Sequence, residues 1–151
     1  MMTTAERFFA KVEFNGPLPE RRPELGPCWL WTRPLEHHYY ARFWDGGRLV
    51  YAHRWAYEFC VAPISDGLEI DHLCRVRHCV NLDHLEVVTS RVNIMRGDTP
   101  AARNFAKTEC PKGHQYTPEN TRLQGPHARW RSCRACNRAS ALRSKQKARL
   151  S

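Results

Sequence analysis

Seven cysteines and eight histidines stand out in this sequence, because several of them have the spacing of metal ligands. Two close pairs near the C-terminus, with 18 residues between them, are Cys110, His114, Cys133 and Cys136. Paired thiolate and imidazole ligands on either side of a hairpin are typical of a zinc knuckle or ribbon, in which Zn²⁺ is held tetrahedrally. The Pro-Lys-Gly segment at 111–113 predicts the tight turn that lets the first pair converge. We therefore expect a structural zinc site here.

A second group of ligand-type side chains lies upstream. Cys74, Cys79 and His84 supply three ligands, and a closed structural zinc site needs four. The two remaining cysteines are Cys28, in the apolar stretch GPCWLW, and Cys60, in the helical segment AYEFC. We choose Cys28 as the fourth ligand and expect Cys60 to be a buried thiol.

Asp71, His72 and Asn93 offer the groups that phosphodiester hydrolysis requires. A neutral imidazole, with an ordinary pKa of about 6.5, can take a proton from water. Carboxylate and amide oxygens are hard ligands that suit Mg²⁺, which can stabilise charge on a phosphate and on the departing 3′ oxygen. An Asp-His pair with a distant Asn also occurs in ordinary cores, so these residue types alone do not decide the function.

The segment DHLCRVRHCVNLDHLEVVTSRVNIMRG resembles the HNH and His-Cys box endonucleases of the ββα-metal superfamily. In the His-Cys box homing endonucleases, a general-base His is followed by Cys, Cys, His and a metal-binding Asn at offsets of 2, 7, 12 and 21. The same offsets relate His72, Cys74, Cys79, His84 and Asn93. Phage-type HNH nucleases resemble the chain through CWLW, AHRWAYEF, DGLEIDHLC, CVNLDHLEVVT and CPKGH…CRAC. The resemblance covers roughly residues 28–136.

The resemblance implies a role for each residue of the site. His72 would be the general base, and Asp71 and Asn93 would hold Mg²⁺ or Mn²⁺. An upstream cysteine completes the zinc site in that family, which supports Cys28. His84 stands where the central Asn of the HNH motif is usual, and it is already used as a zinc ligand.

Function follows from these assignments as a hypothesis with two alternatives. The main interpretation is a Mg²⁺-dependent DNA endonuclease with a one-metal HNH mechanism and two structural Zn²⁺ ions, used in homing, restriction or phage DNA packaging. A zinc-finger DNA-binding regulator would explain the zinc ligands but not the residues at nuclease offsets, and an RNA-binding zinc protein is a third interpretation. One chain carries one active site, so cutting both strands of double-stranded DNA would need a homodimer or two binding events.

The positive charge of the chain is concentrated at one end. The net charge is +9, yet residues 120–151 hold nine Lys and Arg and no Asp or Glu, so the rest of the chain is neutral. Such a segment is typical of contact with a polyanion, or else of a solvated tail. We expect a phosphate contact from one of Arg42, Arg48 and Arg54, and further DNA contacts from the tail residues Arg138, Arg143 and Lys145.

These residues must be positioned by a small α+β fold, with a zinc-stapled ββα-metal core, a C-terminal zinc ribbon or knuckle and a basic helix. Units this small bury little apolar surface and need metal to fold. We predict a nuclease domain over 1–98, a linker over 99–108 and a zinc module over 109–151. The predicted elements are helices at 3–12, 53–60, 89–96 and 135–149, a strand at 69–73, and hairpins at 39–52 and around 123–131. The first hairpin, which turns at Asp45-Gly46-Gly47, is the expected DNA-reading ribbon.

Location is constrained by two absences in the sequence. No apolar run is long enough for a membrane span, and Glu6 and Arg7 interrupt the place where a signal peptide needs its apolar core. We therefore expect an intracellular protein: cytoplasmic or nucleoid-associated, phage-encoded in a bacterial host, or nuclear in a eukaryote.

Overall fold

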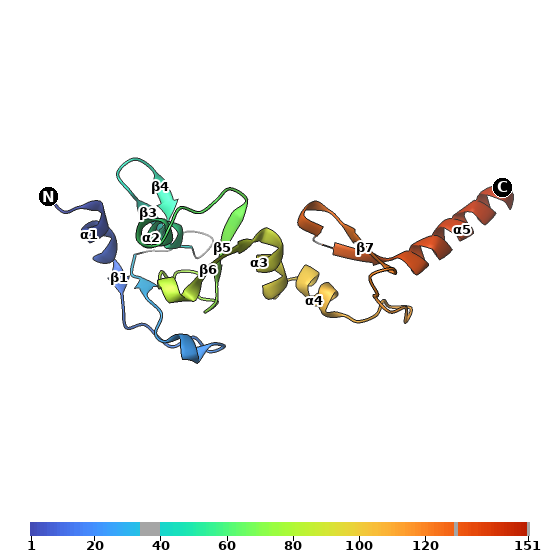
Figure 1. Ribbon diagram of the computed structural model, residues 1–151, viewed down its shortest axis with the longest axis horizontal. Helices are drawn as coiled ribbons and strands as arrows, with labels where there is room; N and C mark the ends of the chain where they lie inside the picture. Colours follow the sequence, from blue (N-terminus) through green and yellow to red (C-terminus); the bar gives the residue numbers. More distant parts are fainter. Residues whose placement is uncertain (34–39, 129, 151) are drawn as a thin grey trace. The chain divides into compact units, whose positions relative to one another are not determined.

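The computed structural model describes residues 1–33, 40–128 and 130–150, and it divides into two compact units, Met1–Thr89 and Ser90–Ser151 (Figure 1). Each unit is built from helices and short antiparallel strand pairs, which confirms a mixed α and β fold with hairpins. No helix in the described part of the chain is long and apolar enough to cross a bilayer.

Three strand pairs and two α-helices make up the described part of the first unit. In chain order its elements are α1 (Thr4–Phe9), β1 (Val12–Glu13), η1 (Pro23–Leu25), β2 (Leu30–Trp31), β3 (Arg42–Trp44), β4 (Leu49–Tyr51), α2 (Ala52–Cys60), β5 (Leu68–His72), η2 (Leu82–His84) and β6 (Leu85–Thr89). β1 pairs with β2, β3 with β4, and β5 with β6. The predicted helix at 53–60 and strand at 69–73 are confirmed to within a residue.

Helix α1 closes the aromatic core of this unit. The Thr3 side chain accepts a hydrogen bond from the Glu6 N–H, and the Glu6 carboxylate accepts one from the Thr3 N–H, so the helix begins with a capping box. Phe8 is fully buried, and its ring centroid lies 5.1 Å from Trp31, 5.0 Å from Phe43 and 4.4 Å from Trp55. The predicted helix is therefore present, although it is shorter than expected and ends at Phe9.

The β3–β4 hairpin turns where the sequence predicts. The Asp45 carboxylate accepts hydrogen bonds from the Gly47 and Arg48 N–H groups at 2.9 Å, and Gly46 takes a φ of +113° that favours glycine. Phe43 points into the core, while the residues that alternate with it on the two strands are exposed: Arg42, Trp44, Leu49 and Tyr51. Tyr39, the expected first residue of this hairpin, lies outside the described residues.

Strands β5 and β6 frame the ligand-rich loop. Their register runs from Leu68 opposite Thr89 to His72 opposite Leu85, so the 73–84 loop begins and ends at the same edge of the pair. The sequence did not separate β6 from the ligand-rich segment. Because the loop is closed by a strand pair, residues at its two ends are brought together.

The second unit contains α3 (Ser90–Arg96), α4 (Pro100–Ala106), β7 (Thr121–Gln124), η3 (Pro126–Ala128), β8 (Trp130–Cys133) and α5 (Arg134–Leu150). The predicted hairpin around 123–131 and the basic helix at 135–149 are confirmed by β7, β8 and α5. Helix α4 lies within 99–108, where the sequence led us to expect a linker. Its N-cap is Thr99, and Pro100 occupies its first position, a common start for a helix.

Candidate functional site

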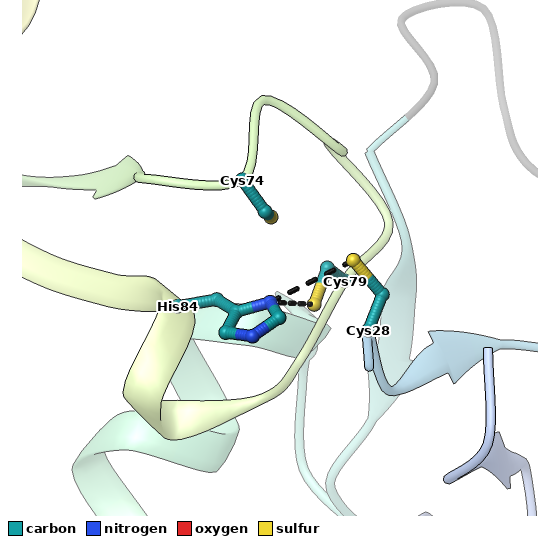
Figure 2. A group of neighbouring side chains, drawn as sticks. All are labelled: Cys28, Cys74, Cys79 and His84. Carbon is teal, nitrogen blue, oxygen red and sulfur yellow. Dashed lines mark hydrogen bonds between the residues drawn. The ribbon is translucent and has the colours of Figure 1, made fainter. Parts of the chain in front are cut away.

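The first Cys/His cluster gathers Cys28, Cys74, Cys79 and His84, all of them buried (Figure 2). The four ligand atoms lie within 4.8 Å of one another, and His84 Nδ1 is 3.6 Å from Cys28 Sγ and 3.5 Å from Cys79 Sγ. Four ligands about 2.3 Å from one zinc ion would be about 3.8 Å apart in a tetrahedron. The structure thus brings together the four residues that the sequence predicts, with spacings that fit a metal ion.

The surroundings of this cluster also suit a metal centre. His84 Nε2 donates a hydrogen bond to the Leu25 carbonyl at 3.0 Å, which turns Nδ1 toward the sulfurs. Histidine ligands commonly donate their second N–H to a carbonyl in this way. The Asn81 N–H points at Cys79 Sγ at 3.5 Å, a bond that stabilises a thiolate. The donor set of three thiols and one imidazole is the chemistry that zinc prefers.

The thiols of this cluster have unequal proton affinities. A hydrogen bond from Cys79 lowers the pKa of Cys74 to about 5, whereas burial raises the pKa of Cys28 to about 11. The protonated thiols would release their protons when they bind a metal ion.

Cys60 is not the buried thiol that the sequence led us to expect. It is exposed at the last position of α2, and the flanking side chains of Phe59 and Val61 are also more than half exposed. The buried residues of this helix lie in its first half, at Ala52, His53 and Ala56. The expectation was wrong because the C-terminal turn of α2 passes beyond the core.

The second Cys/His cluster unites the other four predicted ligands. Cys110, His114, Cys133 and Cys136 have ligand atoms within 4.8 Å of one another. His114 Nδ1 lies 3.5 Å from Cys110 Sγ, 3.6 Å from Cys133 Sγ and 3.3 Å from Cys136 Sγ. These distances again match the edges of a tetrahedron of zinc ligands.

Backbone donors hold the thiols of the second cluster. The Lys112 N–H lies 3.4 Å from Cys110 Sγ, and the Cys136 N–H lies 3.5 Å from Cys133 Sγ. The latter bond is the main reason that the pKa of Cys133 falls to about 6. Gly113 takes a φ of +77° and donates to the Cys110 carbonyl at 2.9 Å, so the predicted tight turn at 111–113 is present.

His72, the expected general base, is buried at the end of β5. Its Nε2 lies 3.1 Å from the Cys79 carbonyl. Because a carbonyl oxygen only accepts, Nε2 must carry the ring proton, and Nδ1 is then the basic nitrogen. Burial lowers the pKa of His72, which favours the neutral form that can accept a proton. The carbonyl that fixes this ring belongs to a residue of the first Cys/His cluster.

His53 is a neighbour of His72 that the sequence reasoning missed. It lies in the first turn of α2, is 8% exposed, and its ring centroid is 4.8 Å from that of His72. Its Nδ1 has no hydrogen-bond partner among the described residues. Burial, with the neighbouring charges of His72 and Arg54, lowers the pKa of His53 to about 3. The sequence signal that could have identified His53 was its place beside alanines in the AHRWAYEF segment, which pack into the core.

The two expected magnesium ligands lie on different elements. Asp71 is buried on β5 beside His72, and its Oδ1 accepts an ion-paired hydrogen bond from Arg75 Nη1 at 2.6 Å. Arg75 takes a left-handed φ of 60°, just after the strand ends. Asn93 lies on α3, four residues beyond the end of β6. Carboxylate and amide oxygens fit the donor chemistry of Mg²⁺.

The three arginines of which one is expected to bind phosphate, Arg42, Arg48 and Arg54, line a single cavity of about 470 Å³. Arg42 lies over the Tyr51 ring at 5.4 Å, and Arg54 pairs with Glu58 at 3.0 Å. The Arg48 side chain is 77% exposed, and its contact with Asp45 is 3.7 Å long. The three arginines thus lie around one hollow. The other expected contacts, Arg138, Arg143 and Lys145, are exposed on α5.

Comparison with known proteins places part of this site in a family. Residues 50–95 match the family model described as HNH endonuclease. A segment of 44 residues is 46% identical to the uncharacterised gene 5.3 protein of Enterobacteria phage T3, and it covers 29% of this chain and 44% of that protein. A segment of 66 residues is 35% identical to protein 7.7 of Escherichia phage T7, and it covers 44% of this chain and 51% of that protein. No solved structure gives a significant match.

Residues 50–95 therefore match the HNH endonuclease family, which confirms the resemblance over that segment. The matched segment includes His53, Asp71, His72, Asn93 and three residues of the first cluster. The chain spans about half the length of the curated relatives it matches, and both relatives are phage proteins.

Proposed function

We propose that this protein is a metal-dependent DNA endonuclease that hydrolyses phosphodiester bonds with His72 as general base. The observation that carries the proposal is the state of His72: it is buried, and the Cys79 carbonyl fixes its tautomer within a segment that matches the HNH endonuclease family. Such a ring holds its basic nitrogen in one place without reorganisation, which is the requirement for deprotonating a water molecule.

The divalent metal belongs to the proposal through its ligands. Asp71 and Asn93 would hold Mg²⁺ or Mn²⁺, since their oxygens are hard donors. When bound there, such an ion stabilises negative charge on the phosphate and on the leaving oxygen. Arg75 forms an ion pair with the carboxylate of Asp71, and this pair offsets part of the cost of burying the carboxylate.

Phosphate binding is assigned to the cavity lined by Arg42 and Arg48 of the β3–β4 hairpin and by Arg54 of α2. Arg48 would meet the scissile phosphate, with Arg42 and Arg54 beside it, since a guanidinium group suits bidentate contact with a phosphate. The exposed face of the β3–β4 hairpin would face the DNA, because a two-stranded ribbon fits the major groove.

The two Cys/His clusters are proposed as structural zinc sites. Each offers four ligands and so leaves no open position for chemistry. The first would fix the loop whose Cys79 carbonyl holds His72, and the second would hold the β7–β8 hairpin against the start of α5.

The domain division at 98 and 109 stays a prediction, and so does a homodimer that cuts both strands.

The setting of the activity is proposed from the relatives. Both are encoded by phages, which supports a phage-encoded protein that acts on DNA inside a bacterial host. A zinc-finger DNA-binding regulator remains the alternative function. Such a regulator would also have the two clusters and the basic helix, but DNA binding alone does not require a buried general base beside a buried carboxylate.

The test is a cleavage assay on supercoiled plasmid DNA with the zinc-loaded full chain and added Mg²⁺. We expect nicked or linear product, none in EDTA, and a rate about 10²–10⁴-fold lower for His72→Ala, the usual cost of losing a general base. His78→Ala is the matched control, because this histidine lies in the loop that follows His72, outside both clusters. It should cut at the wild-type rate.

The regulator interpretation predicts a different result from the same samples. The wild-type protein would shift the plasmid in a gel but leave it supercoiled at every Mg²⁺ concentration. Cleavage by His72→Ala at the wild-type rate, with folding and zinc content unchanged, would remove His72 from the mechanism.

A further inference from the structure

Helix α5 (Arg134–Leu150) carries its positive charges on two separate faces. At about 100° per residue, an arc of about 60° holds four of its six cations. We call these four the basic track: Arg134, Arg138, Lys145 and Arg149. Arg143 and Lys147 fall on the opposite side of the helix. The members of both groups are exposed, so any difference between them comes from direction and not from burial.

The basic track starts at a hollow in the protein surface. Arg122 of β7 joins Arg134, Asn137 and Arg138 in lining a cavity of about 430 Å³. Arg134 Nε donates to the Thr121 carbonyl at 3.2 Å, which holds this guanidinium beside the strand. Three guanidinium groups around one hollow repel one another, and an anion between them would remove that repulsion. Phosphate suits such a place, since guanidinium donors match its oxygens.

Nothing in this segment neutralises the track. Residues 120–151 contain no Asp or Glu, and in the part of the chain that the structure describes no ion pair involves a track residue. Like charges four residues apart, as in Arg134 and Arg138 or Lys145 and Arg149, also destabilise a free helix. The charges are therefore unfavourable in the isolated chain and become favourable beside a polyanion.

The exposure of the helix supports the same conclusion. From Ser140 to Arg149 every described side chain is exposed, so packing against the rest of the unit does not stabilise this part. A helix without tertiary packing is marginal in water. Its length suits an extended partner, because Arg134 and Arg149 are about 22 Å apart along the axis.

We propose that the basic track and Arg122 form a binding site for the phosphate backbone of duplex DNA, in which the hollow holds one phosphate. The inference rests on the proposed DNA endonuclease function and extends it to how the substrate is held. It also divides the contacts that the sequence suggested: Arg138 and Lys145 bind the backbone, whereas Arg143 faces away from it.

Two matched variants of the full, zinc-loaded protein test this site. Arg138→Gln with Lys145→Gln removes one Arg and one Lys from the track, and Arg143→Gln with Lys147→Gln removes the same charges from the opposite face. Affinity for a 24-base-pair duplex of arbitrary sequence is measured by fluorescence anisotropy between 50 and 300 mM KCl, without added Mg²⁺ or Mn²⁺ so that no cleavage occurs.

The track variant should bind tens of fold more weakly near 100 mM salt, and its plot of log K against log salt should be flatter by about 1.8, or about 0.9 for each lost phosphate contact. Arg122→Gln should flatten the plot by about 0.9. The opposite-face variant should match the wild type. Circular dichroism and zinc content confirm that every variant is folded.

Equal weakening by both double variants would overturn the proposal, since the helix would then act only through its total charge. No weakening by either would make α5 a solvated end, and tighter binding of an RNA duplex would overturn the choice of DNA. Failure of the proposed activity is a separate result: a wild-type protein that shows the track effect but never cuts DNA keeps this binding site and loses the nuclease assignment.

Discussion

His53 holds different numbers of protons in the folded and unfolded chain at acid pH. Its pKa is about 3 when buried beside His72, against about 6.5 for an exposed histidine. Between these values only the unfolded chain takes up the proton, so the free energy of unfolding falls as the pH falls below about 6.5. Above that pH the imidazole is neutral in both states and has no such effect.

We therefore expect His53→Gln to reduce the acid sensitivity of the protein. From pH 7 to pH 5 the wild type should lose about 2 kcal/mol more unfolding free energy than the variant. Urea denaturation of zinc-loaded samples at both pH values measures the difference, with His78→Gln, a substitution at a half-buried histidine, as the control. Equal losses in all three proteins would show that His53 does not titrate in this window.

At the residue scale, the sequence predicts most readily the ligands that lie close together in the chain. Cys74, Cys79 and His84 can be read from spacing, and Cys28 follows because a fourth ligand is needed. Cys60 could not be placed in the same way, since its exposure depends on where the core ends along α2. His53 was missed because its contact with His72 exists only after α2 and β5 have packed together.

The 3-10 helix η2 is the element that joins the metal loop to the proline-rich segment before Cys28. Asn81 caps it by accepting the Asp83 N–H at 3.1 Å, and the same side chain donates to the Pro27 carbonyl at 2.9 Å. Because Asn81 is 5% exposed, water cannot easily replace either bond. The side chain thus connects two segments that carry ligands of the first cluster.

Asn81→Ala should destabilise the folded protein by about 1–3 kcal/mol, the usual cost of leaving buried polar groups unpaired. Asp83→Ala is the control in the same turn, since Asp83 is exposed, and it should change stability by no more than about 0.5 kcal/mol. Thermal unfolding with excess zinc compares the two. A change at Asn81 no larger than that at Asp83 would contradict the bridging role.

At the element scale, local signals were sufficient for some segments and not for others. The Asp45-Gly46-Gly47 turn is specified by residue types that accept a left-handed φ and cap their own turn. Helix α4 has Thr99 and Pro100 as start signals, but it is short and gains support from Arg131, which donates to the Asn104 carbonyl at 2.6 Å and lies over Phe105. That support comes from β8, far along the chain.

At the scale of the whole molecule, the described residues of each unit contain one Cys/His cluster. Each unit is small, and each cluster joins segments that are distant in its own part of the sequence. Because small domains of this kind draw much of their folding free energy from the metal, we expect the two zinc ions to stabilise the two units separately.

Elemental analysis of the purified chain should give two zinc ions. Cys79→Ser and Cys133→Ser should each leave one ion, and the double variant should leave none, while Cys60→Ser keeps both because this thiol lies outside the clusters. Hydrogen exchange should then increase mainly in residues 1–89 for the first variant and in 90–151 for the second. One ion in the wild type would show that a cluster does not bind zinc.

Cys28 lies 46 residues before Cys74, whereas the other three ligands of its cluster follow one another within a single loop. The chain entropy that opposes ring closure grows with the logarithm of ring size, so closing the long ring costs about 3 kcal/mol against about 1.5 kcal/mol for a five-residue ring. Three ligands can therefore gather before the fourth arrives. We therefore expect the loop to capture a metal ion first, and the arrival of Cys28 then to join the N-terminal third of the chain to it.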